Sequence, residues 1–307
     1  MERAYPRVIL GCGNFGGIGS APAFFGRGET LEQALELMDA AWAAGITWFD
    51  TADAYGGGRS ETYIGEWIRL RRPGGLRLTT KTFNPLAEGE DRGLAPGRVR
   101  RQIDASLRRL GVERVDLYLA HEWDPDVPVA EVAGVFEELV AAGKIGAYGL
   151  SNIDGAQLRE ALGAGGFFSA VQNSYSLLDR EAEDEVLPLC GPNGLWFQAF
   201  SPLAGGWLTG KYRRDSPAPE GSRMTMRPGP YEHLRDDRVY EALEKLERRG
   251  DPATLAFAWL LADERVSVVL GPRRPEQLQP ALAALDSPLS VEEREALSDE
   301  FRLDAGS

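Results

Sequence analysis

Four side chains with complementary acid–base chemistry stand near the ends of short apolar runs in the first half of the chain. Asp50, Lys81 and His121 each follow a run rich in β-branched, aromatic or leucine residues, and Tyr55 stands five residues after Asp50 beside three glycines. Asp and Gly are also common in ordinary turns, so the Asp50 segment alone would indicate no more than a turn. The repetition of reactive side chains at three successive strand ends favours a catalytic site.

These residue types can reduce a carbonyl group by donating a proton to the developing alkoxide. A free tyrosine has a pKa of about 10 and is a poor acid at neutral pH, and a nearby ammonium lowers that pKa. We therefore expect Lys81 to activate Tyr55 and Asp50 to hold Lys81 in an ion pair. His121 is expected to hydrogen-bond the carbonyl oxygen. None of these side chains supplies hydride, so the reaction requires a nicotinamide cofactor.

The elements that position these residues repeat along the chain. Short apolar runs typical of buried strands alternate with amphipathic helical stretches. Thr30 and Gln33 predict a capping box at the start of the first helix. A strand–helix unit repeated eight times predicts an α/β protein with a (β/α)8 TIM barrel. The strand candidates centre near Ile9, Thr47, Leu78, Leu117, Ala147, Val171, Phe197 and Val268.

The barrel prediction implies where the chemistry should gather. Active sites in this fold lie at the carboxyl ends of the strands, and seven polar or glycine residues are predicted to follow strands directly: Asp50, Lys81, His121, Ser151, Gln172, Ser201 and Gly271. The interval before the last strand is much longer than the others. There, residues 213–230 predict a long loop, and residues 237–248 predict an extra helix after strand 7. No linker divides the chain elsewhere, so residues 1–307 are predicted to form a single domain.

Composition disfavours several classes of function. The chain has 307 residues, 43% of them hydrophobic, and a net charge of -13 that disfavours nucleic acid or an anionic membrane as partner. The Arg-rich stretch 98–109 predicts a solvated helix face. Cys12 and Cys190 provide no disulfide framework, and no run approaches the roughly 18 apolar residues of a membrane span. We expect a cytoplasmic protein without membrane insertion.

Three short motifs suggest other functions and fail on their context. Gly11-Cys12-Gly13-Asn14-Phe15-Gly16 matches G-x-G-x-x-G, but no helical pattern begins before Leu31, which favours a loop at the barrel mouth over a Rossmann fold. Gly149-Leu150-Ser151-Asn152-Ile153 lacks the final glycine of a nucleophile elbow. Pro125 stands where a zinc motif beginning at His121 needs its second histidine. We expect no metal site.

With further motifs, the four residues resemble the pattern of the aldo-keto reductases. That family has a strand-end Asp, a Tyr five residues later, then a strand-end Lys and a strand-end His, in this order. The resemblance runs from about Val8 to about Leu285, and the ordered set is far more specific than any one motif. It implies reduction of small-molecule aldehydes or ketones. The other matching segments are Gly149-Leu150-Ser151-Asn152, Gln172-Asn173-Ser174-Tyr175-Ser176-Leu177-Leu178, Phe200-Ser201-Pro202-Leu203 and Gly210-Lys211-Tyr212.

The resemblance also implies a binding site for NADPH that Asp50 adjoins. Phe200 would lie against the nicotinamide ring. The chain departs from the family at Pro280-Ala281, where many relatives carry Glu-Asn that helps to hold adenine. The other implied contacts are Ser151, Asn152 and Gln172 to the carboxamide, Ser201, Pro202, Leu203, Gly205 and Lys211 to the pyrophosphate, Gly11 and Cys12 from the first loop, and Gly271, Arg273, Arg274 and Gln277 near the adenosine phosphate.

Specificity predictions rest on three residues. Arg273 and Arg274 are adjacent in an acidic chain, and a guanidinium can bind a 2′-phosphate with two charge-assisted hydrogen bonds, which predicts a preference for NADPH over NADH. A solvated turn is the alternative for this pair. Trp123, two residues past His121, predicts contact with bulky apolar substrates, and simple packing is its alternative.

A second class of function stays open at this stage. Potassium-channel β-subunits are similar to this chain, so the protein could be a regulatory or partner subunit that binds a nicotinamide cofactor on the same fold. The intact set of four residues favours the enzyme without excluding this role. The sequence leaves the oligomeric state unknown.

Overall fold

A computed structural model describes residues 5–302 of the chain. Eight parallel strands close into a barrel in chain order, and β8 pairs with β1. This confirms the predicted barrel: seven predicted centres lie inside observed strands, and Thr47 lies one residue before β2. The strands are β1 (Val8–Gly11), β2 (Trp48–Asp50), β3 (Arg77–Thr82), β4 (Val115–Ala120), β5 (Ile145–Ser151), β6 (Ala170–Ser174), β7 (Trp196–Phe200) and β8 (Val266–Leu270).

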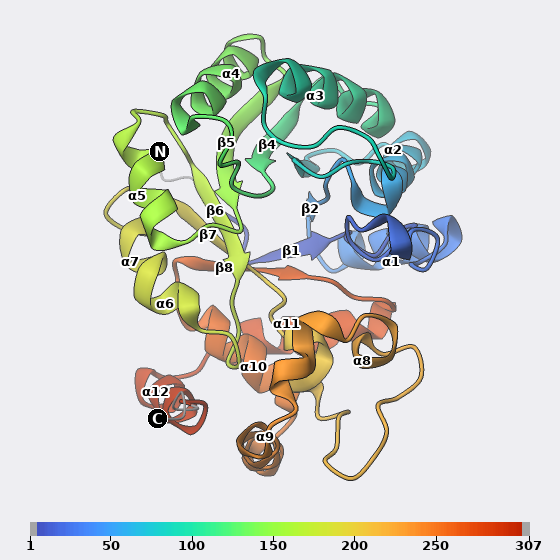
Figure 1. The fold of residues 1–307 in the computed structure, drawn as a ribbon. Helices are drawn as coiled ribbons and strands as arrows, with labels where there is room; N and C mark the ends of the chain where they lie inside the picture. The colour runs from blue at the N-terminus through green and yellow to red at the C-terminus, as the bar shows by residue number, and fades with distance from the viewer. Residues whose placement is uncertain (1–4, 303–307) are drawn as a thin grey trace.

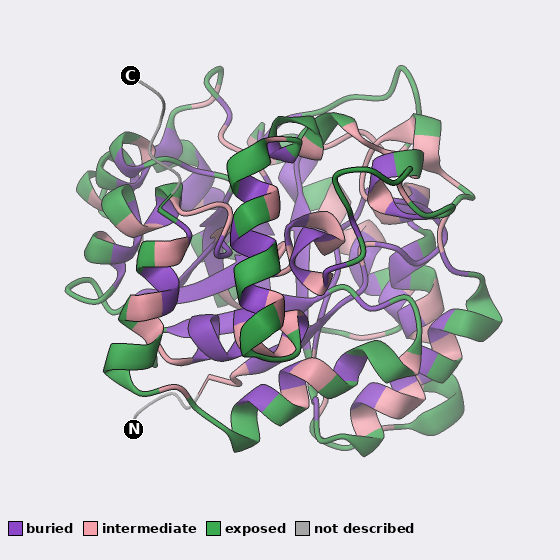
Figure 2. Ribbon diagram, turned by 90° about the horizontal axis from the view of Figure 1, so that it is seen from below, coloured by how far each residue is buried: buried purple, intermediate pink, exposed green. Residues whose placement is uncertain are grey.

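Helices surround the barrel as a ring (Figure 1). Figure 2 shows that these helices turn buried residues toward the strands and exposed residues outward, as an amphipathic helix requires. The ring consists of α1 (Leu31–Ala43), α2 (Arg59–Arg71), α3 (Pro96–Leu110), α4 (Val129–Ala141), α5 (Gly155–Gly163), α6 (Glu181–Glu185), α7 (Leu187–Cys190), α10 (Pro252–Leu261) and α11 (Gln279–Asp286).

Local signals explain where several helices begin and end. Thr30 and Gln33 form the predicted capping box at the start of α1. Gly45 and Gly143 follow α1 and α4 with φ of 80° and 74°, a left-handed conformation that glycine adopts at little cost. These caps satisfy backbone groups at helix ends and return the chain to the next strand.

The interval after β7 contains the predicted extra helix. The long loop carries a short helix, α8 (Arg223–Met226), and a 3-10 segment, Gly229–Leu234. The helix α9 (Asp237–Arg249) then follows. The last helix of the described chain is α12 (Val291–Glu300). Figure 1 shows α8 and α9 outside the ring beside α10 and α11.

The Arg-rich helix α3 corrects one expectation. Arg98 is buried rather than solvated, and its guanidinium donates to Thr82 Oγ1 and to the carbonyl oxygens of Gly93 and Asn84. The physical reason is that the loop after β3 wraps around the side chain and supplies acceptors. A buried guanidinium needs such acceptors, and the local charge pattern does not reveal them.

The amino end of the barrel is closed by aromatic packing. Tyr5 stacks on Trp196 with ring centroids 4.2 Å apart, and Trp48 packs edge-on against the same indole at 4.9 Å. This end is therefore filled by apolar side chains, and polar chemistry is left to the carboxyl end.

The glycine-rich segment after β1 is a loop, and the first α-helix begins at Leu31, which rules out the Rossmann arrangement. A Cβ at Gly11 would lie 2.7 Å from the carbonyl oxygen of Leu270, so only glycine allows β1 and β8 to approach here. Cys12 and Cys190 are free and buried. Within residues 5–302, no helix is long and apolar enough to span a membrane.

Candidate active site

Strand register brings the polar residues to the inside of the barrel at its carboxyl end. Lys81 pairs with Leu119, which belongs to the apolar cluster inside the barrel, and Asp50 pairs with Gly11. Side chains alternate between the two faces of a strand, so Lys81 points inward as Leu119 does. Four of the residues predicted to follow strands directly lie within them, because backbone pairing continues past a polar side chain: Asp50 in β2, Lys81 in β3, Ser151 in β5 and Gln172 in β6.

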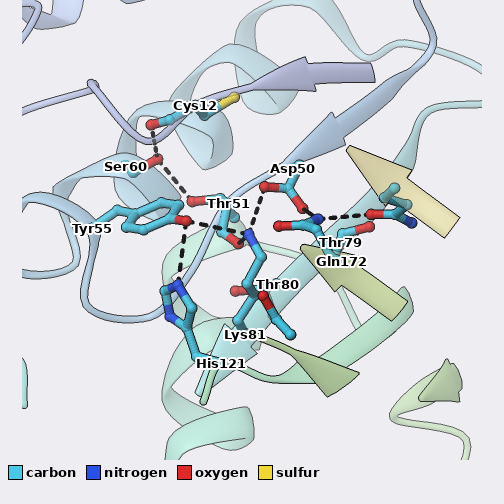
Figure 3. A network of polar contacts seen from close by, with 12 residues as sticks. Cys12, Asp50, Thr51, Tyr55, Ser60, Thr79, Thr80, Lys81, His121 and Gln172 are labelled. Atoms are coloured by element: carbon cyan, nitrogen blue, oxygen red, sulfur yellow. Dashed lines mark hydrogen bonds and ion pairs between the residues drawn. The ribbon is translucent and has the colours of Figure 1, made fainter. Parts of the chain in front are cut away.

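Asp50, Tyr55, Lys81 and His121 form one connected cluster (Figure 3). The Nζ of Lys81 donates to Asp50 Oδ1 at 2.5 Å and to the carbonyl oxygen of Thr51 at 3.0 Å. Tyr55 Oη lies 3.4 Å from Lys81 Nζ and 3.4 Å from His121 Nε2. The phenol therefore faces an ammonium on one side and an imidazole on the other.

Burial, rather than Lys81, decides the pKa of Tyr55. Removal from water raises this pKa, Lys81 opposes the rise, and the net direction is upward. This reverses the expectation that Lys81 lowers the pKa overall, because an anionic phenolate is costly in a buried site. Burial also lowers the pKa of Lys81, but attraction to Asp50 and Tyr55 outweighs burial and raises it. At neutral pH the pair is a neutral phenol beside an ammonium.

His121 is a neutral imidazole in this environment. Burial and then the charge of Lys81 place its pKa well below the usual 6.5. Among the described residues its Nδ1 has no hydrogen-bond partner. Asn152 holds the backbone of His121, with Nδ2 donating to its carbonyl oxygen at 2.8 Å. His121 follows β4 directly, as predicted.

A buried polar network behind β3 fixes the loop that carries Tyr55. The backbone N–H of Asp53 donates to the carbonyl oxygen of Lys81 at 3.0 Å. Thr82 Oγ1 donates to Asp53 Oδ2 at 2.6 Å and accepts from Arg98 at 2.9 Å. Burial raises the pKa of Asp53 to about 7. The network couples the Tyr55 loop to the strand that carries Lys81.

The residues predicted to hold the carboxamide adjoin the cluster. Gln172 Nε2 donates to Asp50 Oδ2 at 2.8 Å and to Gln198 Oε1 at 2.7 Å. Asn152 Nδ2 also donates to Ser151 Oγ at 3.2 Å. Their amide nitrogens therefore have partners within the protein. Asn152 has φ of 53°, a strained conformation that is typical of functional loops.

A pocket of about 350 Å³ opens beside Phe200, which is half-buried at the end of β7. Ser201 and Ala204 have φ of 52° and 46°, so the turn after β7 is strained as well. The pocket is lined by Ser174, Leu178, Asp179, Phe200, Ser201, Ala204, Arg227, Pro230, Tyr231, His233 and Leu234.

The loop predicted to follow the pyrophosphate is covered by two side chains. Tyr231 lies on Gly205, where a Cβ would approach its ring to 2.6 Å, and its Oη is 3.5 Å from Ser201 Oγ. Lys211 lies over Gly206, where a Cβ would come within 2.3 Å of Nζ. Of the other two residues predicted here, Pro202 is buried and Leu203 is half-buried.

Cations from the loop after β7 and the loop after β8 gather at the carboxyl end of the barrel, here called the mouth. Partial burial, and then the charges of Arg223 and Arg273, lower the pKa of Lys211. Arg227 contributes a further positive charge near Arg223. Arg223 hydrogen-bonds Asn14 Oδ1 in the loop after β1. Lys211, Arg223, Arg227 and Arg273 therefore form one positively charged cluster.

Arg273 and Arg274 have different surroundings. Arg273 Nε donates to Glu29 Oε1 at 2.7 Å and Nη1 donates to the carbonyl oxygen of Gly221 at 2.8 Å. Arg274 is exposed. Gln277 Oε1 accepts from the backbone N–H of Arg273 at 2.7 Å, so this side chain caps the turn.

The remaining predicted residues are Gly271, Trp123 and Cys12, and of these Cys12 contacts the four-residue cluster, with its backbone N–H donating to the carbonyl oxygen of Asp50 at 2.8 Å. Gly271 is exposed after β8, and Trp123 is half-buried after β4 and packs on the main core. Cys12 is buried next to the cluster, and its carbonyl oxygen accepts from Ser60 Oγ at 2.9 Å. In residues 5–302, no group of three or more His, Cys, Asp or Glu could hold a metal ion.

Sequence reasoning missed several residues of this mouth: Asn14, Glu29, Arg223, Arg227 and Tyr231. They lie in loops whose composition is typical of ordinary turns. The cationic content of the long loop was the one available signal, because four arginines fall there in an acidic chain: Arg213, Arg214, Arg223 and Arg227.

The donor set fits a nicotinamide dinucleotide. Its cations suit a pyrophosphate, the side-chain amides of Asn152 and Gln172 suit a carboxamide, and the ring of Phe200 suits an aromatic face. The backbone at Gly271 is open, since a Cβ there would meet only Asn14 Nδ2 at 3.9 Å.

Comparison with known proteins gives consistent results. A model of the Aldo/keto reductase family matches residues 7–299. The chain is 33% identical over 300 residues to an NADH-specific methylglyoxal reductase of Escherichia coli, across 89% of this chain and 88% of the relative. It is 32% identical over 283 residues to a putative voltage-gated potassium channel subunit beta of Schizosaccharomyces pombe, across 84% and 80%.

A solved structure agrees over the whole barrel. The glycerol dehydrogenase from Gluconobacter oxydans has a TM-score of 0.83 at 26% identity, with 100% of this chain and 96% of that chain covered. The chain belongs to the aldo/keto reductase family. It is an NAD(P)H-dependent oxidoreductase.

Proposed function

We propose that the protein reduces aldehydes or ketones to alcohols with NADPH and that Tyr55 is the proton donor. The observation that carries this proposal is the phenol 3.4 Å from both Lys81 Nζ and His121 Nε2, with Lys81 held by Asp50 at 2.5 Å. A buried phenol that stays protonated at neutral pH is the form that reduction needs.

Each residue of the cluster has a distinct role in this proposal. Tyr55 donates its Oη proton to the carbonyl oxygen as negative charge develops there. Lys81 stabilises the resulting phenolate, and Asp50 keeps Lys81 in place and limits the unpaired charge in the buried site. Neutral His121 donates from Nε2 to the same oxygen and orients it. When bound, the nicotinamide cofactor supplies the hydride.

The proposed cofactor contacts follow the mouth of the barrel. Ser151, Asn152 and Gln172 hold the carboxamide, and Phe200 lies along the ring. The turn from Ser201 to Gly205 and the cations Lys211 and Arg274 hold the phosphates. Trp123, half-buried past His121, contacts the substrate and favours bulky apolar carbonyl compounds.

Cofactor binding and turnover together test this function. Stopped-flow quenching of protein fluorescence by NADPH and NADH should give dissociation constants, with NADPH binding more tightly. A panel of aldehydes and ketones should then show oxidation of bound NADPH. Absence of dinucleotide binding would refute the proposal, and binding without turnover of any carbonyl compound would refute its catalytic part.

A partner-subunit role is the second candidate, favoured by the similarity to the putative channel subunit of Schizosaccharomyces pombe. The connected cluster at the barrel mouth makes the enzyme the stronger proposal. Affinity purification from the native host separates the two. A stoichiometric complex with a membrane protein would support the second role, and isolation without one would count against it.

A further inference from the structure

Glu29 is the acidic residue buried among the cations of the mouth. It is 3% exposed, and its Oε1 accepts from Arg273 Nε at 2.7 Å. Within the described part of the chain, its Oε2 has no hydrogen-bond partner. The carboxylate is therefore held by a single arginine.

The backbone around Glu29 is rigidly placed. Its N–H donates to the carbonyl oxygen of Asn14 at 2.8 Å, and its own carbonyl oxygen accepts from Gly16 at 2.9 Å. A Cβ at the preceding Gly28 would lie 1.8 Å from the carbonyl oxygen of Asn14, so the two loop segments are in direct backbone contact. The backbone that carries Glu29 is thus fixed by the loop, and Arg273 is the more exposed member of the pair.

We propose that Glu29 determines cofactor specificity by competing with the 2′-phosphate of NADPH for Arg273. This inference rests on the proposed function. Binding a phosphate through two parallel hydrogen bonds uses one edge of the guanidinium, and here Nε is taken by Glu29 and Nη1 by Gly221. A 2′-phosphate must displace the carboxylate or bind beside it, and both arrangements are costly. NADH has a hydroxyl there and meets no such cost.

Arg274 is outside this competition because, among the described residues, the ion pair of Glu29 is with Arg273. The preference for NADPH over NADH then comes mainly from Arg274. Because Glu29 occupies Arg273, this preference is smaller than it would be if both arginines bound the 2′-phosphate. A fixed carboxylate in the first loop would in this way allow both cofactors to be used.

The substitution Glu29→Gln tests the competition, because it keeps the shape and removes the charge. We expect the dissociation constant for NADPH, from fluorescence quenching of the full chain, to fall about ten-fold, the size typical of a charged hydrogen bond. The value for NADH should change less than about two-fold. Glu247→Gln is the matched control, since Glu247 pairs with Arg213 at 2.6 Å and also has one oxygen without a partner among the described residues.

A second substitution identifies Arg273 as the intermediary. In an Arg273→Gln background, Glu29→Gln should no longer change the NADPH-to-NADH ratio. Should Glu29→Gln not fold by circular dichroism, Glu29→Asp keeps the charge but shortens the side chain, and it should shift the ratio in the same direction.

Several results would overturn the proposal. An equal fall in both dissociation constants would mean that Glu29 changes only the general charge of the mouth. An unchanged ratio, or a ratio changed equally by Glu247→Gln, would remove Glu29 from specificity. Binding of neither cofactor by the wild type would refute the proposed function itself, and this inference with it.

Discussion

The acid–base character of Tyr55 is decided by a contest between solvation and charge. Lys81 favours the phenolate, but burial of the phenol has the larger effect and raises its pKa. A donor that keeps its proton in the resting site suits reduction, because the proton is needed only when negative charge appears on the substrate oxygen. Lys81 then stabilises the anion that is left.

Replacing Tyr55 with Phe removes the proton donor and keeps the ring. We expect kcat for aldehyde reduction to fall by about 10²-fold or more, with little change in the dissociation constant for NADPH. Steady-state kinetics and fluorescence titration measure the two quantities. Undiminished aldehyde reduction in this variant would show that another group donates the proton.

The expected pH dependence of carbonyl reduction follows from the directions of two pKa shifts. His121 has a pKa lowered well below 6.5 and stays neutral as the pH falls, and Tyr55 has a raised pKa and stays protonated as the pH rises. We expect kcat/KM for reduction to be level between about pH 6.5 and about pH 9. An acid limb with a midpoint near pH 6.5 that disappears in His121→Gln would contradict this expectation.

At the scale of elements, β3 supports the site from both faces. Lys81 points into the barrel, and Thr80 and Thr82 on either side hydrogen-bond Glu61 and Asp53 behind the strand. Charged groups brought out of water need such partners. The arrangement ties β3 and the Tyr55 loop together, so a change behind the strand should affect the site in front of it.

Asp53 should make stability fall with rising pH. Its pKa of about 7 in the folded protein exceeds the ordinary 3.8, so the folded state binds the proton more tightly. This stability is fully present below about pH 4 and is lost as the pH rises through about 7. The loss is at most about 1.4 kcal/mol per pH unit.

Asp53→Asn keeps an acceptor for Thr82. It should therefore flatten the dependence of the free energy of unfolding on pH between about 4 and 7. Urea unfolding at several pH values between 4 and 8 measures it. Asp91→Asn is the control, because that carboxylate is 55% exposed. A profile that keeps its slope in Asp53→Asn would assign the pH dependence to other groups.

At the scale of the whole molecule, the mouth joins segments far apart in sequence. Arg273 contacts Glu29 in the first loop and Gly221 in the loop after β7, and Arg223 reaches Asn14. These contacts connect the amino-terminal loop to the last third of the chain around the proposed cofactor site. The mouth is therefore a product of barrel closure.

Removing the side chain of Arg273 should lower the free energy of unfolding. Arg273→Ala leaves the buried carboxylate of Glu29 without its ion-pair partner, and we expect a loss of about 1–3 kcal/mol in the free energy of unfolding. Adding Glu29→Gln should restore most of it, because the unpaired charge is then gone. Thermal and urea unfolding of the two variants measure the effect, and a double variant no more stable than Arg273→Ala would argue against the pair as its source.

Local patterns in the sequence were sufficient for the architecture and the reactive residues. Strand-forming runs and the Thr30 capping box depend on neighbours within a few residues, so they predict the eight strand–helix units and the chain order of the barrel. The barrel then requires strand-end side chains to face one another. That is why Asp50, Lys81 and His121 could be grouped before their contacts were known.

Tertiary structure alone decided burial, charge state and the pairing of distant loops. The pKa of Tyr55 rises and Arg98 is buried because other elements exclude water from them, and no local pattern records that exclusion. The pairing of Glu29 with Arg273 joins residues 244 positions apart. Such contacts exist only once the barrel closes, because closure brings the β1 and β8 loops together.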